Sequence, residues 1–365
     1  MGLQLNAFKQ GDGDMTQFWS AVARRLEPYV PGEQPRVANL IKLNTNEHAL
    51  PPSPRALQAM AAVLNESLRR YPDPNATSLG NAIAEQEGLQ PDQVFTGNGS
   101  DEVLAHVFQG LLAASTSFVT PDITYSFYPV WANLYGLAHQ TLPLREDFSI
   151  DVEGLCQCSG AILLANPNAP TGIALTLDQL DKVLSSDLNR LVVVDEAYFG
   201  FGAQSASALL GSFPNLLITR SLSKSHALAG LRVGYALGSK DLIEALRRVK
   251  DSFNSYPLDL LAQTGAAAAL KDVRWFEEAS ATIIANRAYL AGALVGLGFE
   301  VCPSEANFVF AAHQDVKGKL LFEHLRSNNI LVRRWDHSRI ENYLRITVGT
   351  REQCEALVAV LAANV

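Results

Sequence analysis

Residues 219–234 read TRSLSKSHALAGLRVG and surround a single lysine, Lys224, with small hydroxyl side chains. The stretch begins where the aliphatic run NLLIT (215–219) ends, and Arg232 follows the lysine by eight residues. Lysines are rarely buried unless they are paired or take part in chemistry. The position of Lys224 at the end of an apolar run therefore raises the question of what the lysine does there.

Short aliphatic runs alternate with helix-like stretches over much of the chain. From about residue 100, helix-like stretches alternate with the short aliphatic runs SFVT (117–120), AILLAN (161–166) and LVVVDEAY (191–198). Runs that are apolar on both faces are typical of interior strands in a parallel sheet covered by helices. We therefore expect an α/β fold with a mostly parallel central sheet between helices.

The sequence pattern changes after Pro257, where long helical stretches are followed by a mixed α/β tail. This change predicts a second, smaller domain. We expect an N-terminal arm (1–41) that packs with the small domain, a large domain (42–258) and a small C-terminal domain (259–365). Thr350 and Gln353 stand at capping-box spacing, which predicts the start of the last helix.

Composition excludes several classes of protein. The 365 residues carry 29 Lys and Arg against 37 Asp and Glu, a net charge of −8, which argues against a nucleic-acid partner. The opening residues lack a secretory signal and no apolar run is long enough for a membrane helix, so we expect a cytoplasmic protein. The cysteines and histidines show no metal-binding spacing, and we expect no metal.

Polar residues gather just after the aliphatic runs. Asp195 follows LVVV, Lys224 follows NLLIT, Tyr125 follows FVT, and NPNAPTG (166–172) follows AILLA. In an open parallel sheet these strand ends lie on one edge, where ligands bind. The glycine-bearing loop GNGSDE (97–102) opens a strongly amphipathic helix, and its backbone amides form a ready phosphate site.

Each of these features has an ordinary structural explanation when it is taken alone. Asp195 could cap a helix, Lys224 could be a solvated loop lysine, and the prolines could mark turns. Together they form the set that pyridoxal 5'-phosphate needs: a lysine for its aldehyde, a buried carboxylate for its ring nitrogen, and donors for its phosphate. On this interpretation Lys224 bonds to the aldehyde and Asp195 holds the ring nitrogen. The phosphate would be surrounded by Ser100, Asp101, Ser221, Ser223 and Arg232.

The order of the motifs resembles a known family. GNGSDE (97–102), TYSFY (124–128), NPNAPTG (166–172), VVVDEAYFGF (192–201), residues 219–235 and YLRITVGT (343–350) are similar to the fold type I pyridoxal-phosphate aminotransferases. Within them, LEPYVPG, IKLNTNEHALPPSP and RRYPDP resemble the histidinol-phosphate aminotransferase family. The resemblance implies a homodimer with shared active sites that moves an amino group from a small-molecule donor to 2-oxoglutarate by a ping-pong mechanism.

The resemblance also implies roles around the cofactor. Tyr125 would stack on its ring, Tyr198 would bond its phenolic oxygen, and Tyr71 would reach the phosphate in the neighbouring subunit. Many family members carry asparagine where this chain has Ala169, and Asn168 is the candidate to replace it. A histidine at position 226 is a second departure, which we interpret as a packed residue near Lys224 rather than a catalyst.

Substrate contacts follow from the same resemblance. Arg345 would clamp a substrate carboxylate through its two-pronged guanidinium. Arg333 and Tyr29 would help to hold the phosphate of histidinol phosphate. Arg334 follows Arg333 directly. It could share the role of Arg333, or it could equally well be an ordinary exposed basic residue on an edge strand.

Three other functions fit the same constellation. Two share the fold: an aminotransferase for aromatic amino acids and a phosphothreonine decarboxylase. The third is a non-catalytic cofactor-binding regulator, against which the intact lysine, aspartate and arginines argue.

Overall fold

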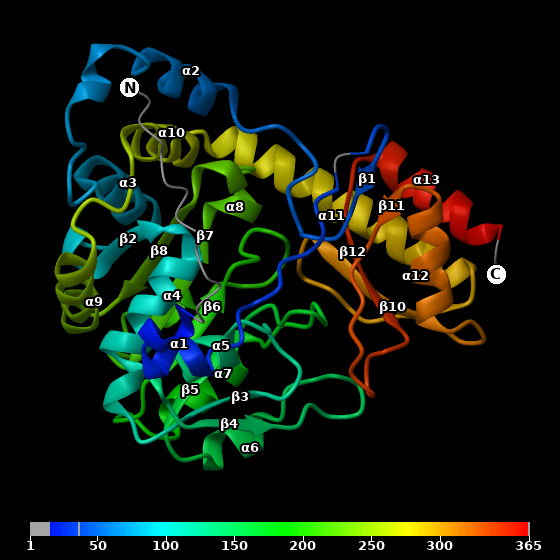
Figure 1. Ribbon diagram of the computed structural model, residues 1–365, viewed down its shortest axis with the longest axis horizontal. Helices are drawn as coiled ribbons and strands as arrows, with labels where there is room; N and C mark the ends of the chain where they lie inside the picture. Colours follow the sequence, from blue (N-terminus) through cyan, green and yellow to red (C-terminus); the bar gives the residue numbers. More distant parts are fainter. Residues whose placement is uncertain (1–14, 36, 364–365) are drawn as a thin grey trace, which may run out of the picture.

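A computed structural model describes residues 15–35 and 37–363 (Figure 1). Seven strands form one sheet in the order β2-β8-β7-β6-β5-β3-β4. All run parallel except β8, which pairs antiparallel with both neighbours. Their bounds are β2 Val94–Asn98, β8 Val233–Gly238, β7 Leu216–Ser221, β6 Val192–Glu196, β5 Ala161–Ala165, β3 Phe118–Pro121 and β4 His139–Leu142. The predicted α/β fold with a mostly parallel sheet is confirmed.

The central strands β5, β6 and β7 are buried along their whole length, as their uninterrupted aliphatic sequences predict. Successive residues point to opposite faces, so Val193 packs in one core cluster while Val192 and Val194 pack in the other. One face is covered by α4 (Gly99–Gly110), α5 (Tyr128–Tyr135) and α9 (Lys240–Phe253). The other is covered by α2 (Pro54–Ala62), α3 (Thr77–Glu87), α6 (Val152–Gln157), α7 (Leu177–Ser185) and α10 (Leu260–Leu270).

A smaller lobe is built on a three-stranded antiparallel sheet in the order β12-β10-β9. These strands span Tyr343–Thr347, Phe308–His313 and Phe299–Val301. Helices α12 (Gly318–Ser327), α13 (Arg351–Ala362) and the long α11 (Val273–Gly296) pack around them. The predicted capping box of α13 is present, with the Thr350 hydroxyl accepting from the Gln353 amide. In Figure 1, α11 begins beside the large sheet and runs into the small lobe.

The segment before α2 joins the lobes. Strand β1 (Ile41–Lys42) pairs with β11 (Ile330–Leu331) in parallel, and the described part of the arm contains α1 (Ala21–Arg25). Arg25 exchanges hydrogen bonds with Asn133 of α5, while Glu33 pairs with Arg326 of α12. The arm therefore touches both lobes, and residues 1–14 lie outside the described part. The domain boundaries at 41/42 and 258/259 stay a prediction.

Short elements complete the chain. Helix α8 (Leu222–Ser225) follows β7 directly, and 3₁₀ turns lie at Met15–Phe18, Glu66–Arg69, Pro91–Gln93, Leu112–Ala114, Ala206–Leu209 and Ala229–Leu231. Within residues 15–35 and 37–363, no helix combines the length and apolar character that crossing a bilayer requires.

Candidate active site

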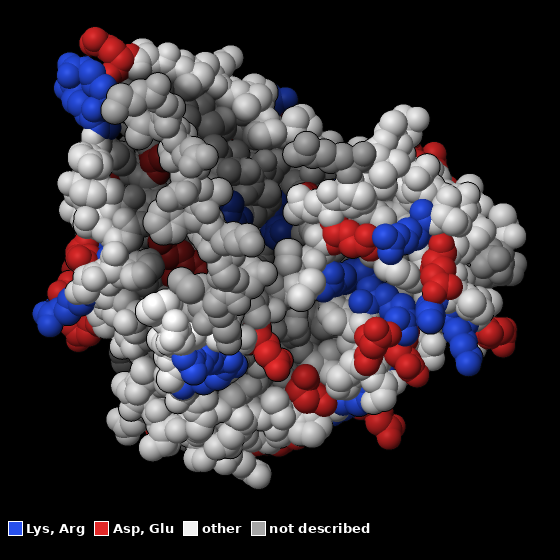
Figure 2. All heavy atoms as spheres, viewed as in Figure 1, with Lys and Arg blue, Asp and Glu red and all other residues white. Residues whose placement is uncertain are grey.

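A cavity lies between the two lobes, at the carboxyl ends of β5, β6 and β7 and the start of α4. Figure 2 shows the surface hollowed between the lobes, with Lys and Arg atoms at the bottom of the hollow. Most residues predicted for the site line this cavity: Tyr29, Ser100, Asp101, Tyr125, Asp195, Tyr198, Ser221, Ser223, Lys224, Arg232, Arg333 and Arg345. The topology thus gathers side chains from widely separated parts of the sequence, as strand ends in a parallel sheet should.

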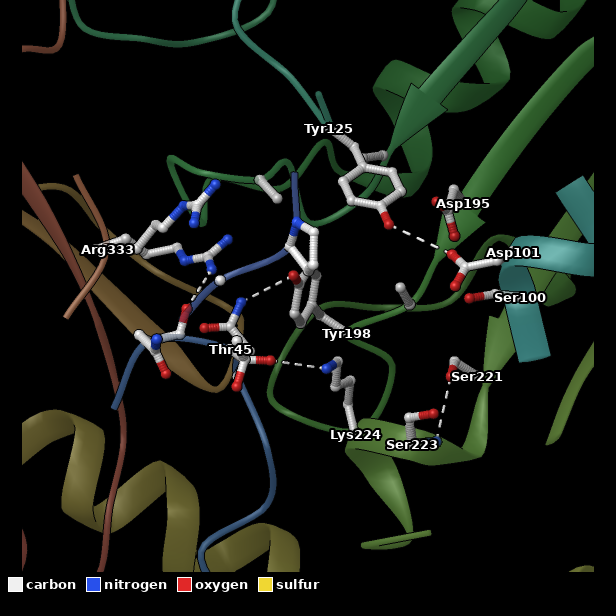
Figure 3. Close-up of a pocket in the computed structure, with 18 of the residues that line it drawn as sticks. Thr45, Ser100, Asp101, Tyr125, Asp195, Tyr198, Ser221, Ser223, Lys224 and Arg333 are labelled. Carbon is white, nitrogen blue, oxygen red and sulfur yellow. Dashed lines mark hydrogen bonds between the residues drawn. The ribbon is translucent and has the colours of Figure 1, made fainter. Parts of the chain in front are cut away.

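Lys224 extends into the cavity from α8, toward the segment that precedes α2 (Figure 3). Its Nζ donates to the backbone oxygen of Thr45 at 2.9 Å. Burial lowers the pKa of Lys224 to about 8, and the positive charge of Arg345 adds to the effect. A lysine in this state holds a substantial neutral fraction near neutral pH, which makes it a nucleophile and a base.

Asp195 stands at the end of β6 with only 3% of its surface exposed. Tyr128 Oη donates to its Oδ2 at 2.9 Å, and Thr219 Oγ1 donates to its Oδ1 at 3.0 Å. Burial raises the pKa of Asp195 to about 6, while these two hydrogen bonds lower it. A carboxylate so enclosed favours a cationic partner, and the Asp195 side chain borders the cavity where such a partner fits.

The start of α4 forms a cradle with β8. Gly99 has a positive φ of 82°, and a Cβ on it would lie 2.6 Å from the Arg232 guanidinium. A Cβ on Gly234 of β8 would lie 2.3 Å from the Ser100 amide nitrogen, so the two backbones touch. The first turn of α4 borders the cavity through Ser100 and Asp101, and the free amides of a helix start can bind an anion.

Arg232 closes this cradle. Its Nη2 lies 3.1 Å from Asp101 Oδ2 and its Nη1 donates to Ser223 Oγ at 3.3 Å. Ser221 Oγ accepts from the Ser223 amide at 3.2 Å and so caps α8. Helix-end amides, hydroxyls and a guanidinium together are the donors that a phosphate group takes.

Tyr125 and Tyr198 lie on the wall of the cavity. Tyr125 Oη donates to Asp101 Oδ1 at 3.3 Å, and Tyr198 Oη accepts from Asn46 Nδ2 at 2.9 Å. Burial raises the pKa of both phenols, so both carry their protons. Each hydroxyl is therefore a hydrogen-bond donor near the lysine and the aspartate.

Two arginines meet at the small-lobe side of the cavity. The backbones of Arg333 and Arg345 pair with each other through hydrogen bonds of 3.0 and 2.9 Å. Both guanidinium groups lie within 6 Å of the Trp335 ring, at 5.7 and 5.2 Å. Among the described residues neither has a carboxylate partner, and Arg345 Nε is buried without a hydrogen bond. Two uncompensated cations in a cavity indicate an anionic ligand.

Arg334 behaves differently from these two. Its Nε donates to the Glu341 carbonyl at 2.7 Å, and its Nη1 pairs with Asp336 at 2.6 Å. Arg334 does not line the cavity. Its role is the ordinary structural one.

Two residues assigned to the cofactor do not reach the cavity in this chain. The Asn168 side chain is fully buried, donates to the Ile123 carbonyl and accepts from the Thr124 hydroxyl. Its hydrogen-bonding groups are used within the loop, so the structure does not support Asn168 as a replacement for the missing asparagine. Tyr71 is 83% exposed and stacks on Tyr256 of its own chain at 4.8 Å.

The structure adds residues that the sequence reasoning missed. Asn44, Thr45 and Asn46 line the cavity, and Tyr128 and Thr219 hold Asp195. The first three lie in IKLNTNEHALPPSP, and the resemblance of this stretch to the family was the available signal. Tyr128 ends the quoted motif TYSFY, but the motif does not show that its hydroxyl donates to Asp195.

Comparisons with known proteins show the family of the chain. The pattern of the family described as aminotransferase class I and II matches residues 38–361. Histidinol-phosphate aminotransferase of Gluconacetobacter diazotrophicus is 55% identical over 95% of this chain and 98% of its own length. Histidinol-phosphate aminotransferase 1 of Bradyrhizobium diazoefficiens is 55% identical over 95% of this chain and 99% of its own.

A solved structure extends the match to the fold. The histidinol-phosphate aminotransferase of Sinorhizobium meliloti, in complex with pyridoxal-5'-phosphate, superposes with a TM-score of 0.81 at 24% identity. The match covers 88% of this chain and 90% of that one. Because the family pattern and the curated relatives both span nearly the whole chain, it belongs to the class I and II aminotransferases and, within them, to the histidinol-phosphate aminotransferase family.

Proposed function

We propose that this enzyme uses pyridoxal 5'-phosphate to transfer the amino group of histidinol phosphate to 2-oxoglutarate. The observation that carries the substrate assignment is a pair of arginines at the edge of the cavity, Arg333 and Arg345, that have no carboxylate partner within residues 15–35 and 37–363. One substrate carries a phosphate and the other two carboxylates, so both need cationic groups near the reacting carbon.

The donor set of the cavity fits the cofactor. The cradle between α4 and β8 has no room for a Cβ at Gly99 or Gly234 and offers amides, Ser221, Ser223 and Arg232 to a phosphate. Asp195 would face the ring nitrogen, with its carboxylate already fixed by two neutral donors. When bound, pyridoxal phosphate supplies the electron sink that stabilises negative charge on the substrate's α-carbon.

The chain's own side chains provide acid and base. Because the pKa of Lys224 is about 8, its Nζ gives up and regains a proton near neutral pH. Its neutral Nζ is the group that would hold the cofactor and would take the proton from the substrate's α-carbon. The Asn46 amide fixes Tyr198 Oη at 2.9 Å on the wall of the cavity, where the phenol would donate to the cofactor's phenolic oxygen.

The arginines orient the substrate. Arg345 is fixed through Nη2 to the Asn44 carbonyl at 3.0 Å, which leaves its remaining donors for an incoming anion. Arg333 lies beside it, and Tyr29 completes the anion site from the arm. An anion held here would lie in the same cavity as Lys224.

The test compares donors with purified protein. We expect a yellow preparation that a carbonyl-trapping reagent bleaches, and a kcat/KM for histidinol phosphate well above those for phenylalanine and phosphothreonine with 2-oxoglutarate as acceptor. Formation of glutamate is the readout. Higher kcat/KM with phenylalanine identifies an aromatic aminotransferase, carbon dioxide without glutamate identifies a decarboxylase, and a colourless protein overturns the proposal.

The proposal extends to the oligomeric state and the cellular location of the enzyme. We infer a homodimer in the cytoplasm, in which Tyr71 reaches the cofactor phosphate of the partner subunit. Exposed apolar side chains near Tyr71 support an interface there, since Leu68, Phe253 and Tyr256 are 51, 76 and 43% exposed.

A further inference from the structure

Four flat groups stand in a column beside the lysine. The His226 ring stacks on Phe276 with centroids 4.8 Å apart and planes within 11°. Phe276 also stacks on Phe199, at 5.9 Å and 11°. The Arg220 guanidinium carbon lies 3.8 Å from the centre of the Phe199 ring. Phe276 is therefore held between two planar side chains from the large lobe.

The position of each member links the column to the site. Phe199 lies four residues after Asp195, and His226 lies two residues after Lys224. Phe276 belongs to α11, whose later residues Ile283 and Leu290 are buried in the core of the small lobe. The column therefore connects both catalytic strand ends to the helix that enters the small lobe.

The backbone after Asp195 is shaped to admit Phe276. Gly200 has a positive φ of 94°, and a Cβ there would lie 2.7 Å from Phe276 Cζ. A side chain at position 200 would push the ring away, so this close approach requires glycine.

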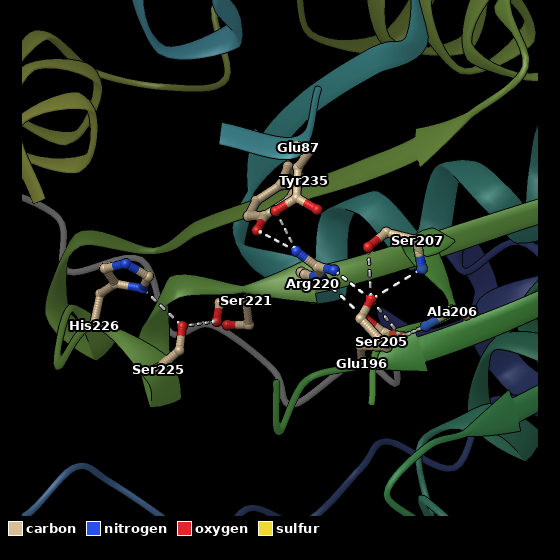
Figure 4. A network of polar contacts seen from close by, with 10 residues as sticks. All are labelled: Glu87, Glu196, Ser205, Ala206, Ser207, Arg220, Ser221, Ser225, His226 and Tyr235. Atoms are coloured by element: carbon tan, nitrogen blue, oxygen red, sulfur yellow. Dashed lines mark hydrogen bonds and ion pairs between the residues drawn. The ribbon is translucent and has the colours of Figure 1, made fainter. Parts of the chain in front are cut away.

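His226 is also tied to the helix that carries the lysine (Figure 4). Ser225 Oγ donates to the Ser221 carbonyl at 3.3 Å, so it accepts from His226 Nδ1 at 2.8 Å. Burial lowers the pKa of His226 to about 3, which keeps the ring neutral, and its Nε2 has no partner among the described residues. The ring thus contributes one hydrogen bond and one flat face.

The other end of the column is anchored. Arg220 is 1% exposed and donates to Glu87 at 2.6 Å, to Glu196 at 2.8 Å and to Ser205 at 2.6 Å, as Figure 4 shows. A guanidinium held at so many points cannot slide, so the Phe199 ring that it covers is fixed as well.

We propose that His226 is a positioning residue, whose stacking on Phe276 holds Lys224 at a fixed place relative to α11 and thereby to the small lobe. The inference rests on the proposed function, because it concerns the lysine that acts in transamination. A shift of about 1 Å in a catalytic group can cost about 100-fold in rate, so loss of the stack should reach the chemistry.

The test uses the holoenzyme and compares two kinds of variant. His226→Ala and Phe276→Leu remove the stack, whereas His226→Phe keeps it and gives up only the hydrogen bond to Ser225. We expect the first two to lower kcat about tenfold or more, with KM changed less than about threefold, and to shift the pH midpoint of the cofactor's visible absorbance. His226→Phe should retain the wild-type midpoint and most of kcat.

Leu290→Ala is the matched control, because it removes a buried side chain from the same helix outside the column. It should lower the melting temperature without moving the absorbance midpoint. Wild-type kcat and midpoint in both His226→Ala and Phe276→Leu would overturn the inference, as would His226→Phe that is as impaired as His226→Ala. If His226→Ala fails to fold, the kcat and the absorbance midpoint of Phe276→Leu and His226→Phe decide whether the inference holds. Colour and transamination of the unaltered protein test the proposed function separately.

Discussion

At the scale of single residues, the burial of Lys224 lowers the free energy of unfolding of the protein. Its pKa of about 8 in the fold lies below the ordinary lysine value of 10.5, so the folded chain binds this proton less tightly than the unfolded chain. A base whose pKa falls on folding destabilises the fold at every pH below its folded pKa. That penalty declines as the pH rises from 8 toward 10.5, because the folded lysine is then already neutral.

Lys224→Met should therefore stabilise the apoprotein while it abolishes turnover. The pKa difference corresponds to about 3 kcal/mol, from which the lost bond to Thr45 removes about 1, leaving a gain of about 2 kcal/mol at pH 7. Urea denaturation of the cofactor-free protein measures it. The gain should shrink at pH 10, and an equal gain at both pH values would show that the charge of Lys224 is not its source.

Ala227 is a second residue that lowers the stability of the fold, through its backbone conformation. Its φ is 57°, in the left-handed region, directly after the turn that carries Lys224 and His226. Ala227→Gly should raise the free energy of unfolding by about 1 kcal/mol, because glycine adopts this conformation without strain. Thermal unfolding is the readout.

The matched control for this substitution is Ala359→Gly, in the middle of α13 and exposed. There alanine is the better residue, and the change should destabilise by about 0.5–1 kcal/mol. Destabilisation by both substitutions would contradict the strain at Ala227.

The sequence predicted the reactive residues of the site better than their supports. Lys224 and Asp195 end aliphatic runs, so a linear pattern reveals them. Tyr128 and Asn46 lie in quoted motifs, but their long-range contacts to Asp195 and Tyr198 cannot be read from a local pattern. For Asn168, proximity in sequence suggested the role, whereas the structure shows its side chain bonded to Thr124 and Ile123 instead.

At the scale of elements, Arg220 joins β7 to β6 and to the end of α3. Glu87 and Glu196, its two carboxylate partners, are nearly as buried as Arg220 itself. Arg220→Met should cost about 3–5 kcal/mol, because it leaves two buried carboxylates without a cation. Equilibrium denaturation measures the loss.

Arg248→Met provides the comparison for Arg220→Met. Arg248 forms an exposed i,i+4 pair with Glu244 on α9, and its loss should cost less than about 0.5 kcal/mol. Similar losses for the two arginines would mean that burial of the Arg220 network contributes little.

Elements were predictable where one local rule dominates. The uninterrupted aliphatic runs became the buried strands β5, β6 and β7, and the Thr350 capping box begins α13. The antiparallel strand β8 carries no such sign, because strand direction is set by the connection and not by the residues of the strand. Its glycine Gly234 signals close backbone approach only once the fold is known.

At the scale of the whole molecule, the exposed aromatic pair Tyr71 and Tyr256 predicts a second copy of the chain. Sedimentation should give a dimer. Tyr71→Ala and Lys224→Ala should each be nearly inactive, and mixing them with subunit exchange should restore about a quarter of wild-type activity, because half of the dimers then hold one complete site. A monomer, or no recovery on mixing despite exchange, would contradict shared sites.

The contact between Gly234 and the Ser100 amide has a practical consequence for altering this scaffold. Arg333, Arg345 and Tyr29 border the substrate side of the cavity and present replaceable side chains to a designer who wants a new amino donor. Position 234 offers no such choice, since even a methyl group would sit 2.3 Å from a backbone nitrogen. A mutagenesis library should therefore randomise the arginine side and leave this glycine untouched, so that new specificities are sampled on variants that still load their cofactor.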